Sequence, residues 1–287
     1  MRFDGTVMSN ALKTKLITIG RSRRTAWSVT AIGAIIVLLP LAIVAAVSFH
    51  TTGSSLGSST SPGSWTLNNY ARAWTQGRLG WAFLNSVWVA LTVTVLQAIT
   101  SAMAAYALAR LQFRGRQGLL LLFLATLAIP LQLLVVPIFM VLKWGSLIDT
   151  YGALILPTAV NGFGIFLLRQ YFSTIPIEIE EAAILDGADR WQILWKIIVP
   201  LSRPAIVALC LFSFVGEWND VIKPLVFTTR PELQTVQLAL ANFQEQFTND
   251  WPLLMAGVMI ATLPIVVLFL AAQKQFVRGL ATTGTKI

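Results

Sequence analysis

Six stretches of about 20 mostly apolar residues are the feature that most constrains this chain. A helix of about 20 apolar residues crosses the roughly 30 Å hydrocarbon core of a bilayer. The predicted spans are approximately 27–49, 82–108, 118–142, 151–168, 205–227 and 253–273. Charged residues make up only 11% of the chain, against about 25% in soluble domains. The sequence therefore predicts an all-α integral membrane protein with six transmembrane helices.

The fourth stretch differs from the others because it contains Pro157, Asn161 and Gly162. Backbone groups that face lipid cannot be left without hydrogen-bond partners. We therefore expect an irregular helix here, buried against its neighbours.

The distribution of basic residues predicts the orientation. With both termini in the cytoplasm, 16 of the 21 Lys and Arg residues lie in inside segments, as the positive-inside rule requires. The chain then divides into a cytoplasmic N-terminal tail (1–26), a six-helix transmembrane domain (27–273) with a long inner loop (169–204), and a cytoplasmic C-terminal tail (274–287). The net charge of +9 then records membrane topology, and no nucleic-acid partner is expected.

The sequence contains no catalytic or metal-binding pattern. There is no Gly-Lys dipeptide and hence no Walker A loop, and His50 is the only histidine. Gly53–Gly57 matches G-x-S-x-G, but it lies in a Ser/Gly-rich outer loop and no histidine follows it, which favours a flexible linker. We expect no catalytic residue, no metal site and no cofactor on this chain. Energy for any active process must come from another chain or from an ion gradient.

The long inner loop is predicted to form two short helices. Pro176 suits a first helical position, and Gly187 is placed to end the first helix in a left-handed conformation. Asp189 is positioned to cap a second helix over 190–199, which we expect to stop at Pro200. Pro204 then marks the return to the membrane. Three acidic residues fall near the first helix N-terminus, where the helix dipole favours anions: Glu178, Glu180 and Glu181.

The surface of this predicted hairpin favours contact with a partner. Small residues would allow another backbone to approach closely: Ala182, Ala183, Gly187 and Ala188. The second helix is too apolar for an unpartnered cytoplasmic loop, with Trp191, Ile193, Leu194, Trp195, Ile197 and Ile198. Two interpretations stay open on these grounds, a protein-docking element and an interfacial hairpin on the inner leaflet.

Polar residues also occur deep in the fifth predicted span. Glu217, Asn219 and Asp220 lie at or beyond the bilayer midplane, where acidic side chains need partners. Asp220 and Lys223 are three residues apart and suit an ion pair, although Lys223 also has the length to snorkel outward. One interpretation is a transport pathway that hydrogen-bonds a hydroxyl-rich substrate, with Trp218 offering an aromatic face. The other is a gate or a contact with a second membrane subunit.

Two further polar residues, Gln132 and Asn161, are candidates for the pathway lining. Each is equally suited to satisfying the backbone of a neighbouring helix.

Several motifs together resemble a known family. The run from Glu181 through Asp186 to Ala188, continuing to 200–204, resembles the EAA loop of permease subunits in binding-protein-dependent ABC importers. Other stretches resemble its sugar-transporting branch, in particular the smaller permease of the maltose type. These are Phe83–Ser86, Ala104–Arg110, Gly162–Gln170 and Trp218–Asp220. Trp195 stands where the family usually has Phe.

The resemblance implies a subunit that pairs with a second homologous permease, two ATPase subunits and an external solute-binding protein. The ATPase subunits would bind ATP and Mg. The complex is expected in the inner membrane of a prokaryote, where this chain contacts membrane lipid. The implied coupling residues are Glu181, Ala182, Ala183, Asp186, Gly187, Ala188, Trp195, Pro200 and Pro204. The outer segment 228–252 is either a contact for the binding protein, through Gln234, Gln237, Asn242 and Gln244, or an ordinary solvated loop. The alternative to an ABC importer is an ion-coupled secondary transporter that uses Glu217 and Asp220.

Overall fold

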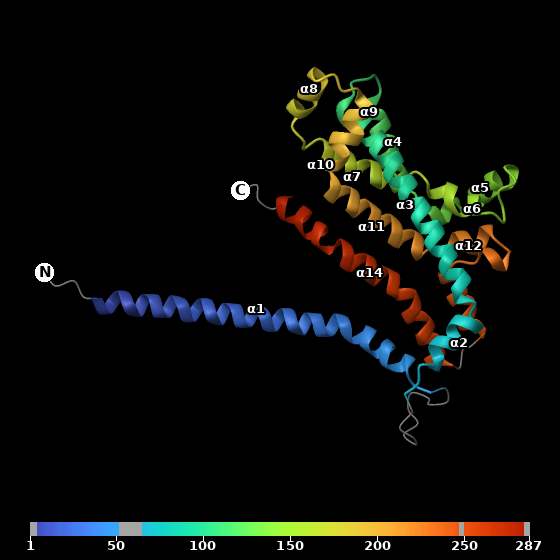
Figure 1. The fold of residues 1–287 in the computed structure, drawn as a ribbon, viewed down its shortest axis with the longest axis horizontal. Coiled ribbons are helices and arrows are strands. Elements are labelled where there is room, and N and C mark those ends of the chain that lie inside the picture. Colours follow the sequence, from blue (N-terminus) through green and yellow to red (C-terminus); the bar gives the residue numbers. More distant parts are fainter. Residues whose placement is uncertain (1–4, 52–64, 247–249, 284–287) are drawn as a thin grey trace.

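The computed structural model describes residues 5–51, 65–246 and 250–283, and in these ranges the regular secondary structure is helical apart from one isolated bridge between His50 and Trp65. Figure 1 shows the helices as a bundle from which one long helix and one short hairpin project. The Gly53–Gly57 segment lies outside the described residues. The helices are α1 (Gly5–Ser48), α2 (Asn68–Gln76), α3 (Leu79–Arg110), α4 (Arg116–Leu127), α5 (Leu131–Trp144), α6 (Tyr151–Ile155), η1 (Leu156–Thr158), α7 (Gly162–Phe172), α8 (Ile177–Leu185), α9 (Arg190–Gln192), η2 (Ile193–Ile198), α10 (Val199–Leu201), α11 (Arg203–Trp218), α12 (Ile222–Phe227), η3 (Pro231–Leu233), α13 (Val236–Gln246) and α14 (Trp251–Thr283).

Three helices are long and apolar enough to cross a membrane unaided, within 27–48, 79–110 and 251–273. Three bent pairs raise the total to as many as six spans. In the first pair, α4 and α5 meet at 102° around Pro130, which removes a backbone donor and stops the helix. The fourth predicted span is interrupted between η1 and α7 with a bend of 43°, as its Pro and Gly residues led us to expect.

The third bend separates the inner loop from the fifth span. The segment 190–201 meets α11 at 81°, and Ser202 lies at the corner. The fifth predicted span is also shorter than expected, because α11 ends at Trp218 and a second helix, α12, begins at Ile222. The polar residues of this region therefore lie at a break between two helices and not within one.

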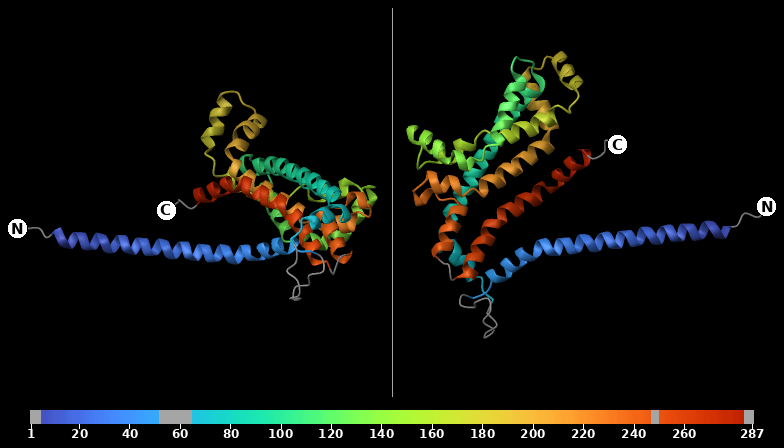
Figure 2. Two further views of the ribbon diagram at one scale, coloured as in Figure 1. Left: turned by 60° about the horizontal axis from the view of Figure 1, so that its bottom comes forward. Right: turned by 180° about the vertical axis from the view of Figure 1, so that it is seen from behind.

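The long helix α3 lies at the centre of the bundle. It packs against α7 and α11, and α11 in turn packs against α14. In the right view of Figure 2, α11 and α14 run side by side and α3 crosses them at an angle. One core cluster surrounds Leu79, Trp218 and Phe243 near the start of α3, and another surrounds Tyr106, Phe172 and Leu209 near its end.

Helix α1 points away from the bundle over most of its length, as Figures 1 and 2 show. It is continuous from Gly5, so no break in the helix separates the predicted N-terminal tail from the first span. Its apolar side chains between 27 and 41 are exposed, for example Val37 at 75%. Its end is held by Asn69, whose amide donates to the carbonyl oxygens of Ser48 and His50 at 2.9 and 2.7 Å.

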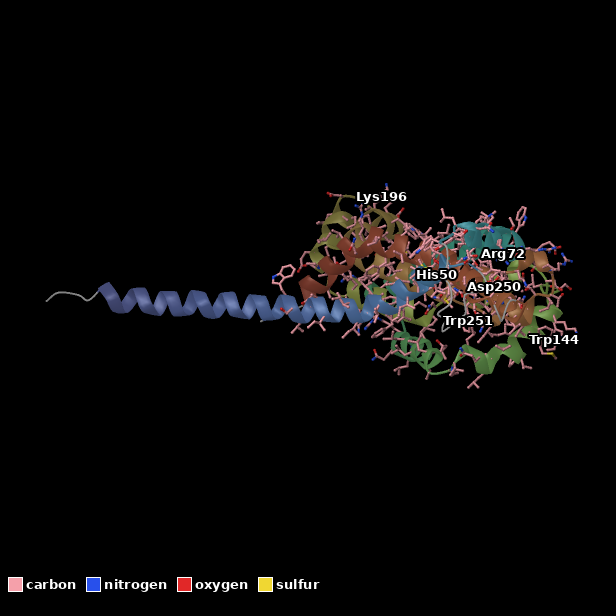
Figure 3. All side chains as sticks on the ribbon, turned by 90° about the horizontal axis from the view of Figure 1, so that it is seen from below. His50, Arg72, Trp144, Lys196, Asp250 and Trp251 are labelled. Carbon is pink, nitrogen blue, oxygen red and sulfur yellow. The ribbon has the colours of Figure 1, made fainter. Side chains whose placement is uncertain are left out.

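A salt bridge joins α2 to the start of α14. The guanidinium of Arg72 on α2 lies 3.2 Å from the carboxylate of Asp250, which precedes α14. The other carboxylate oxygen of Asp250 accepts a hydrogen bond from the Leu253 backbone and so caps α14. Figure 3 shows both residues beside Trp251 and far from the free end of α1.

Candidate functional site: a protruding hairpin and an intramembrane polar network

The hairpin is built from α8, the turn at Gly187, and the segment 190–201, and it projects from the bundle in Figure 1. Gly187 has φ +82°, a left-handed conformation that suits glycine. The Asp189 carboxylate accepts a hydrogen bond of 2.8 Å from the Gln192 backbone and caps the second helix, as predicted. The first helix begins at Ile177, so Pro176 occupies the N-cap position and not the first helical turn.

The second helix of the hairpin does not stop at Pro200, which corrects the prediction. It passes through the π-helical segment η2 and continues to Leu201. The change of hydrogen-bonding register after a π-helical segment accommodates the missing N–H of proline. The corner falls two residues later, and Pro204 lies in the first turn of α11.

The two faces of the hairpin have different environments. Leu185 is 88% exposed and Trp191 59%, whereas Ile193 and Ile198 are buried against the bundle. The predicted small-residue face is divided, because Ala183 packs into the chain's own core and Ala188 packs beside it. The predicted coupling residues that remain exposed are Glu181, Ala182, Asp186, Gly187 and Trp195. These exposed residues are therefore the part of the motif available to a partner.

The hairpin is fastened to α3 by a buried ion pair that sequence reasoning missed. Arg110 Nε lies 2.6 Å from Glu180 Oε1, with both side chains at most 10% exposed. This contact lacks the alignment of a hydrogen bond and acts as a charge pair. Tyr106, one turn earlier on α3, donates a hydrogen bond of 3.2 Å to the other carboxylate oxygen. Glu180 therefore serves as a buried counter-ion in addition to lying at a helix N-terminus.

A second polar assembly lies at the break between α11 and α12. Lys223 Nζ is 2.5 Å from Glu217 Oε2 and 3.3 Å from Asp220 Oδ2, and it donates to Thr158 Oγ1 at 2.8 Å. The pairing of Asp220 with Lys223 agrees with the prediction. Lys223 is only 2% exposed, so it does not snorkel outward. Asp220 Oδ1 also accepts from the backbone of Ile222 at 2.9 Å and caps α12.

This assembly extends across the middle of α3 through Gln97. Its amide donates to the Thr158 carbonyl oxygen at 2.6 Å, and its side-chain oxygen accepts from Ser213 Oγ at 2.5 Å. Asn161 donates to the same oxygen at 3.3 Å and caps α7 through the Phe163 backbone. Asn161 therefore stabilises neighbouring helices in this conformation, which is one of the two roles left open. We call the residues Gln97, Thr158, Asn161, Ser213, Glu217, Asp220 and Lys223 the polar network.

Trp218 and Gln132 lie apart from the polar network. Trp218 is fully buried, stacks on Phe214, and donates through its indole N–H to the Ala261 carbonyl oxygen. Its ring is therefore closed to a sugar in this conformation, contrary to the pathway interpretation. Gln132 lies exposed at the start of α5. Asn219 accepts a hydrogen bond from Gln237 at 3.1 Å and connects the helix break to the outer segment.

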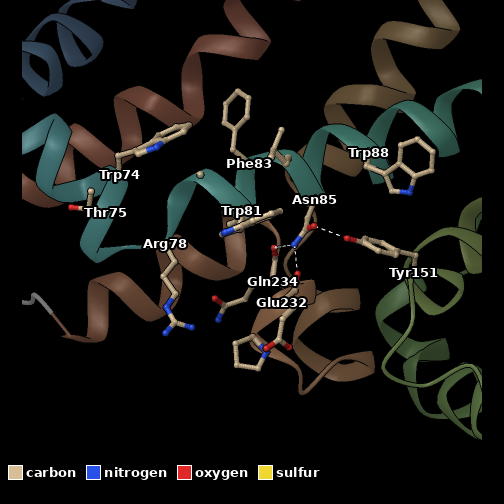
Figure 4. A pocket seen from close by; sticks show the side chains of 14 residues that line it. Trp74, Thr75, Arg78, Trp81, Phe83, Asn85, Trp88, Tyr151, Glu232 and Gln234 are labelled. Carbon is tan, nitrogen blue, oxygen red and sulfur yellow. Dashed lines mark hydrogen bonds between the residues drawn. The ribbon is translucent and has the colours of Figure 1, made fainter.

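In the described part of the segment 228–252, the chain folds back onto the bundle as η3 and α13. Val236 and Phe243 on α13 are buried in the core, while Gln244 is exposed. Asn85 on α3 holds η3 by donating to the carbonyl oxygens of Glu232 and Gln234, and it accepts from Tyr151, as Figure 4 shows.

An open groove of about 1090 Å³ runs beside Asn85, lined by Trp81, Trp88 and the side chain of Gln234. A second depression of about 320 Å³ includes Asn242. Two of the four predicted contact residues therefore line surface depressions.

These features define a multi-span membrane protein with a projecting hairpin and a buried polar network. Residues 98–282 match the family described as "Binding-protein-dependent transport system inner membrane component". The chain belongs to this family and is a multi-pass inner-membrane permease subunit of an ABC transporter, which is a non-catalytic membrane component.

The relatives include transport permeases from several bacteria. The chain is 35% identical over 226 residues to the arabinooligosaccharides transport system permease protein AraQ of Halalkalibacterium halodurans, covering 78% of this chain and 81% of the relative. It is 33% identical over 274 residues to the trehalose transport system permease protein SugB of Mycobacterium tuberculosis, covering 93% and 99%. A solved bacterial ABC transporter involved in alginate import has the same fold, with a TM-score of 0.75 at 21% identity, covering 96% of this chain and 99% of that chain.

Proposed function

We propose that this chain is the permease subunit of an ATP-driven importer for a sugar, an oligosaccharide or a sugar-like polyol. The observation that carries the proposal is the projecting hairpin, whose exposed Leu185 and Trp191 require a partner surface. The substrate class is supported by relatives whose names specify arabinooligosaccharides, diacetylchitobiose, trehalose and lactose.

The proposed topology has six spans with both termini in the cytoplasm. It counts each bent helix pair as one span. The excess of basic residues in the inside segments supports this orientation. The hairpin then lies in the cytoplasm, and α13 and the groove beside Asn85 lie outside.

In the proposed assembly, this chain pairs with a second permease, two ATPase subunits and an external solute-binding protein. One of the structures that share this fold is a complex with a periplasmic binding protein. ATP and Mg would be held by the ATPase subunits, and the exposed residues Glu181, Ala182 and Gly187 would dock there. ATP-driven movement of the docked hairpin would then switch the spans between two states, as alternating access requires. The apolar side chains of α1 would be covered by lipid or by the second permease.

The polar network fits the role of a gate in this scheme. It joins the two interrupted spans, since Lys223 follows the α11 break and Thr158 precedes the α7 break. Breaks of this kind occur where backbone lines a cavity or is buried in protein. Outside the network, Gln234 and Asn242 line the surface depressions that we assign to the binding protein.

Uptake by the reconstituted complex tests the function. Proteoliposomes containing this chain, its second permease and both ATPases should accumulate a labelled oligosaccharide only when ATP and the binding protein are both present. The ion-coupled alternative predicts that an uncoupler alone abolishes uptake. That result would contradict the proposal, as would accumulation without ATP.

A further inference from the structure

We infer that Arg110, Glu180 and Tyr106 form a rigid joint that makes the coupling helix α8 move as one body with the span α3. These are positioning residues, and the inference rests on the proposed function because it assigns them to coupling. Three observations support the inference: α8 has few other attachments to the bundle, Arg110 contacts three segments at once, and the paired charges are buried.

Helix α8 has few other attachments to the bundle. Of its nine residues, only Glu180 and Ala183 are buried. Ile177, Ile184 and Leu185 are 45%, 57% and 88% exposed, so its apolar side chains do not fasten it to the bundle. A force applied to α8 by a docked partner must therefore pass to the bundle through the Glu180 carboxylate, the Ala183 contact and the chain ends.

Arg110 connects α8 to two other segments at once. While its Nε contacts Glu180, its Nη2 donates to the carbonyl oxygens of Phe172 and Ile175 at 2.7 and 2.6 Å. Phe172 ends α7, and Ile175 lies in the linker that leads into α8. The planar guanidinium fixes these contacts in one geometry, which a lysine ammonium would not do. A single side chain at the end of α3 therefore holds α7, the linker and α8 together.

Burial makes this joint stiff. The side chains of Arg110 and Glu180 are 10% and 6% exposed, and Tyr106 is 5% exposed. Water does not compete strongly for these charges, so separating them would leave both without compensation. The joint is therefore expected to stay closed while the rest of the transporter changes state.

The first test measures motion. Spin labels at Glu178→Cys on α8 and Met103→Cys on α3, both exposed positions, are introduced together with Cys210→Ser into the full complex. The separation of the labels should be narrow and equal without nucleotide and with ATP bound. A change in that separation between the two states of the otherwise unmodified joint would overturn the inference, whether or not any further variant folds.

The second test measures coupling in the unlabelled complex, in which position 178 is still glutamate. Glu180→Gln removes the charge, Tyr106→Phe removes one hydrogen bond, and Glu178→Gln is the matched control on the exposed face of α8. Glu180→Gln should reduce the sugar transported per ATP hydrolysed by about 2- to 30-fold, with ATPase subunits still co-purifying. Introduced into the labelled complex of the first test, it should broaden the label separation. Tyr106→Phe should change the transport per ATP and the label separation in the same directions, but by less.

The outcomes separate the joint from the general function. Transport per ATP unchanged in Glu180→Gln relative to Glu178→Gln would overturn the inference. If Glu180→Gln does not assemble, Tyr106→Phe and the label separation in the unmodified joint decide it. If the unmodified complex takes up no sugar, the proposed function fails, and the label separation still reports whether the joint is rigid.

Discussion

Removing the Lys223 charge is the most informative perturbation of the polar network. Lys223→Met keeps the length of the side chain but leaves the carboxylates of Glu217 and Asp220 without their cation. These carboxylates belong to side chains only 8% and 17% exposed. Breaking a buried ion pair by removing one partner costs about 3–5 kcal/mol. Asp220 contributes less of this cost than Glu217, because its carboxylate also accepts a hydrogen bond from the first turn of α12.

We expect Lys223→Met to lower the melting temperature of the detergent-purified complex by several degrees, about 6 °C for a loss of about 3 kcal/mol at roughly 2 °C per kcal/mol. Lys223→Met with Glu217→Gln should recover part of the loss, because it removes one of the uncompensated charges. Adding Asp220→Asn should recover most of it, since replacing a whole buried ionic group by neutral side chains is often neutral or stabilising. Asparagine also preserves the helix cap.

Uptake distinguishes a gate from simple packing. If the network opens and closes during transport, the neutral triple variant should be stable yet impaired in sugar uptake. A triple variant with normal uptake would refute the gate role. If the Lys223→Met variant had the same melting temperature as the unmodified protein, the assignment of Lys223 as the counter-charge would be refuted.

Three further predictions concern glycine positions and an outer turn. Gly164→Ala should destabilise the complex by about 1–3 kcal/mol, because its Cβ would lie 2.5 Å from a side-chain oxygen of α3. As a control, the Cβ of Gly118→Ala meets nothing within 4 Å, so this variant should have the melting temperature of the unmodified protein. Gly187→Pro should abolish uptake while membrane insertion persists, because proline does not adopt φ +82°; normal uptake would contradict the coupling role. Hydrogen bonds from Thr229 lower the pKa of the exposed Asp149 carboxyl below its usual value. The stability that this carboxylate contributes is therefore present above its ordinary pKa and lost as the pH falls through the lowered one, which amide exchange at Thr229 should report.

Local rules predicted the hairpin turn well. The Asp189 cap and the left-handed Gly187 depend on residues within three positions of each other, where spacing alone determines the geometry. The Asp220–Lys223 pair is local in the same sense. The predicted end of the second helix at Pro200 was wrong because a π-helical segment changes the hydrogen-bonding register before Pro200. No periodicity in the sequence indicated that change.

Contacts between distant segments were the part that sequence reasoning missed. Glu180 looked like an anion at a helix N-terminus, and its pairing with Arg110 depends on how the hairpin folds against the end of α3. The Glu217–Lys223 pair requires the helix break after Trp218, because residues six apart do not face each other on a continuous helix. One of the two sequence interpretations gave Trp218 an aromatic face for substrate, but packing between α11 and α14 buries it completely.

Side chains at three positions along helix α3 bind three other parts of the molecule. Asn85 holds the segment around η3, Gln97 holds the interrupted fourth span, and Arg110 holds α8. These anchors are 12 and 13 residues apart, or about 18 and 20 Å along the axis. No Gly or Pro lies between Asn85 and Arg110, so the usual causes of a kink are missing there. A displacement imposed at the hairpin would therefore reach both the polar network and the groove beside Asn85 through one continuous helix.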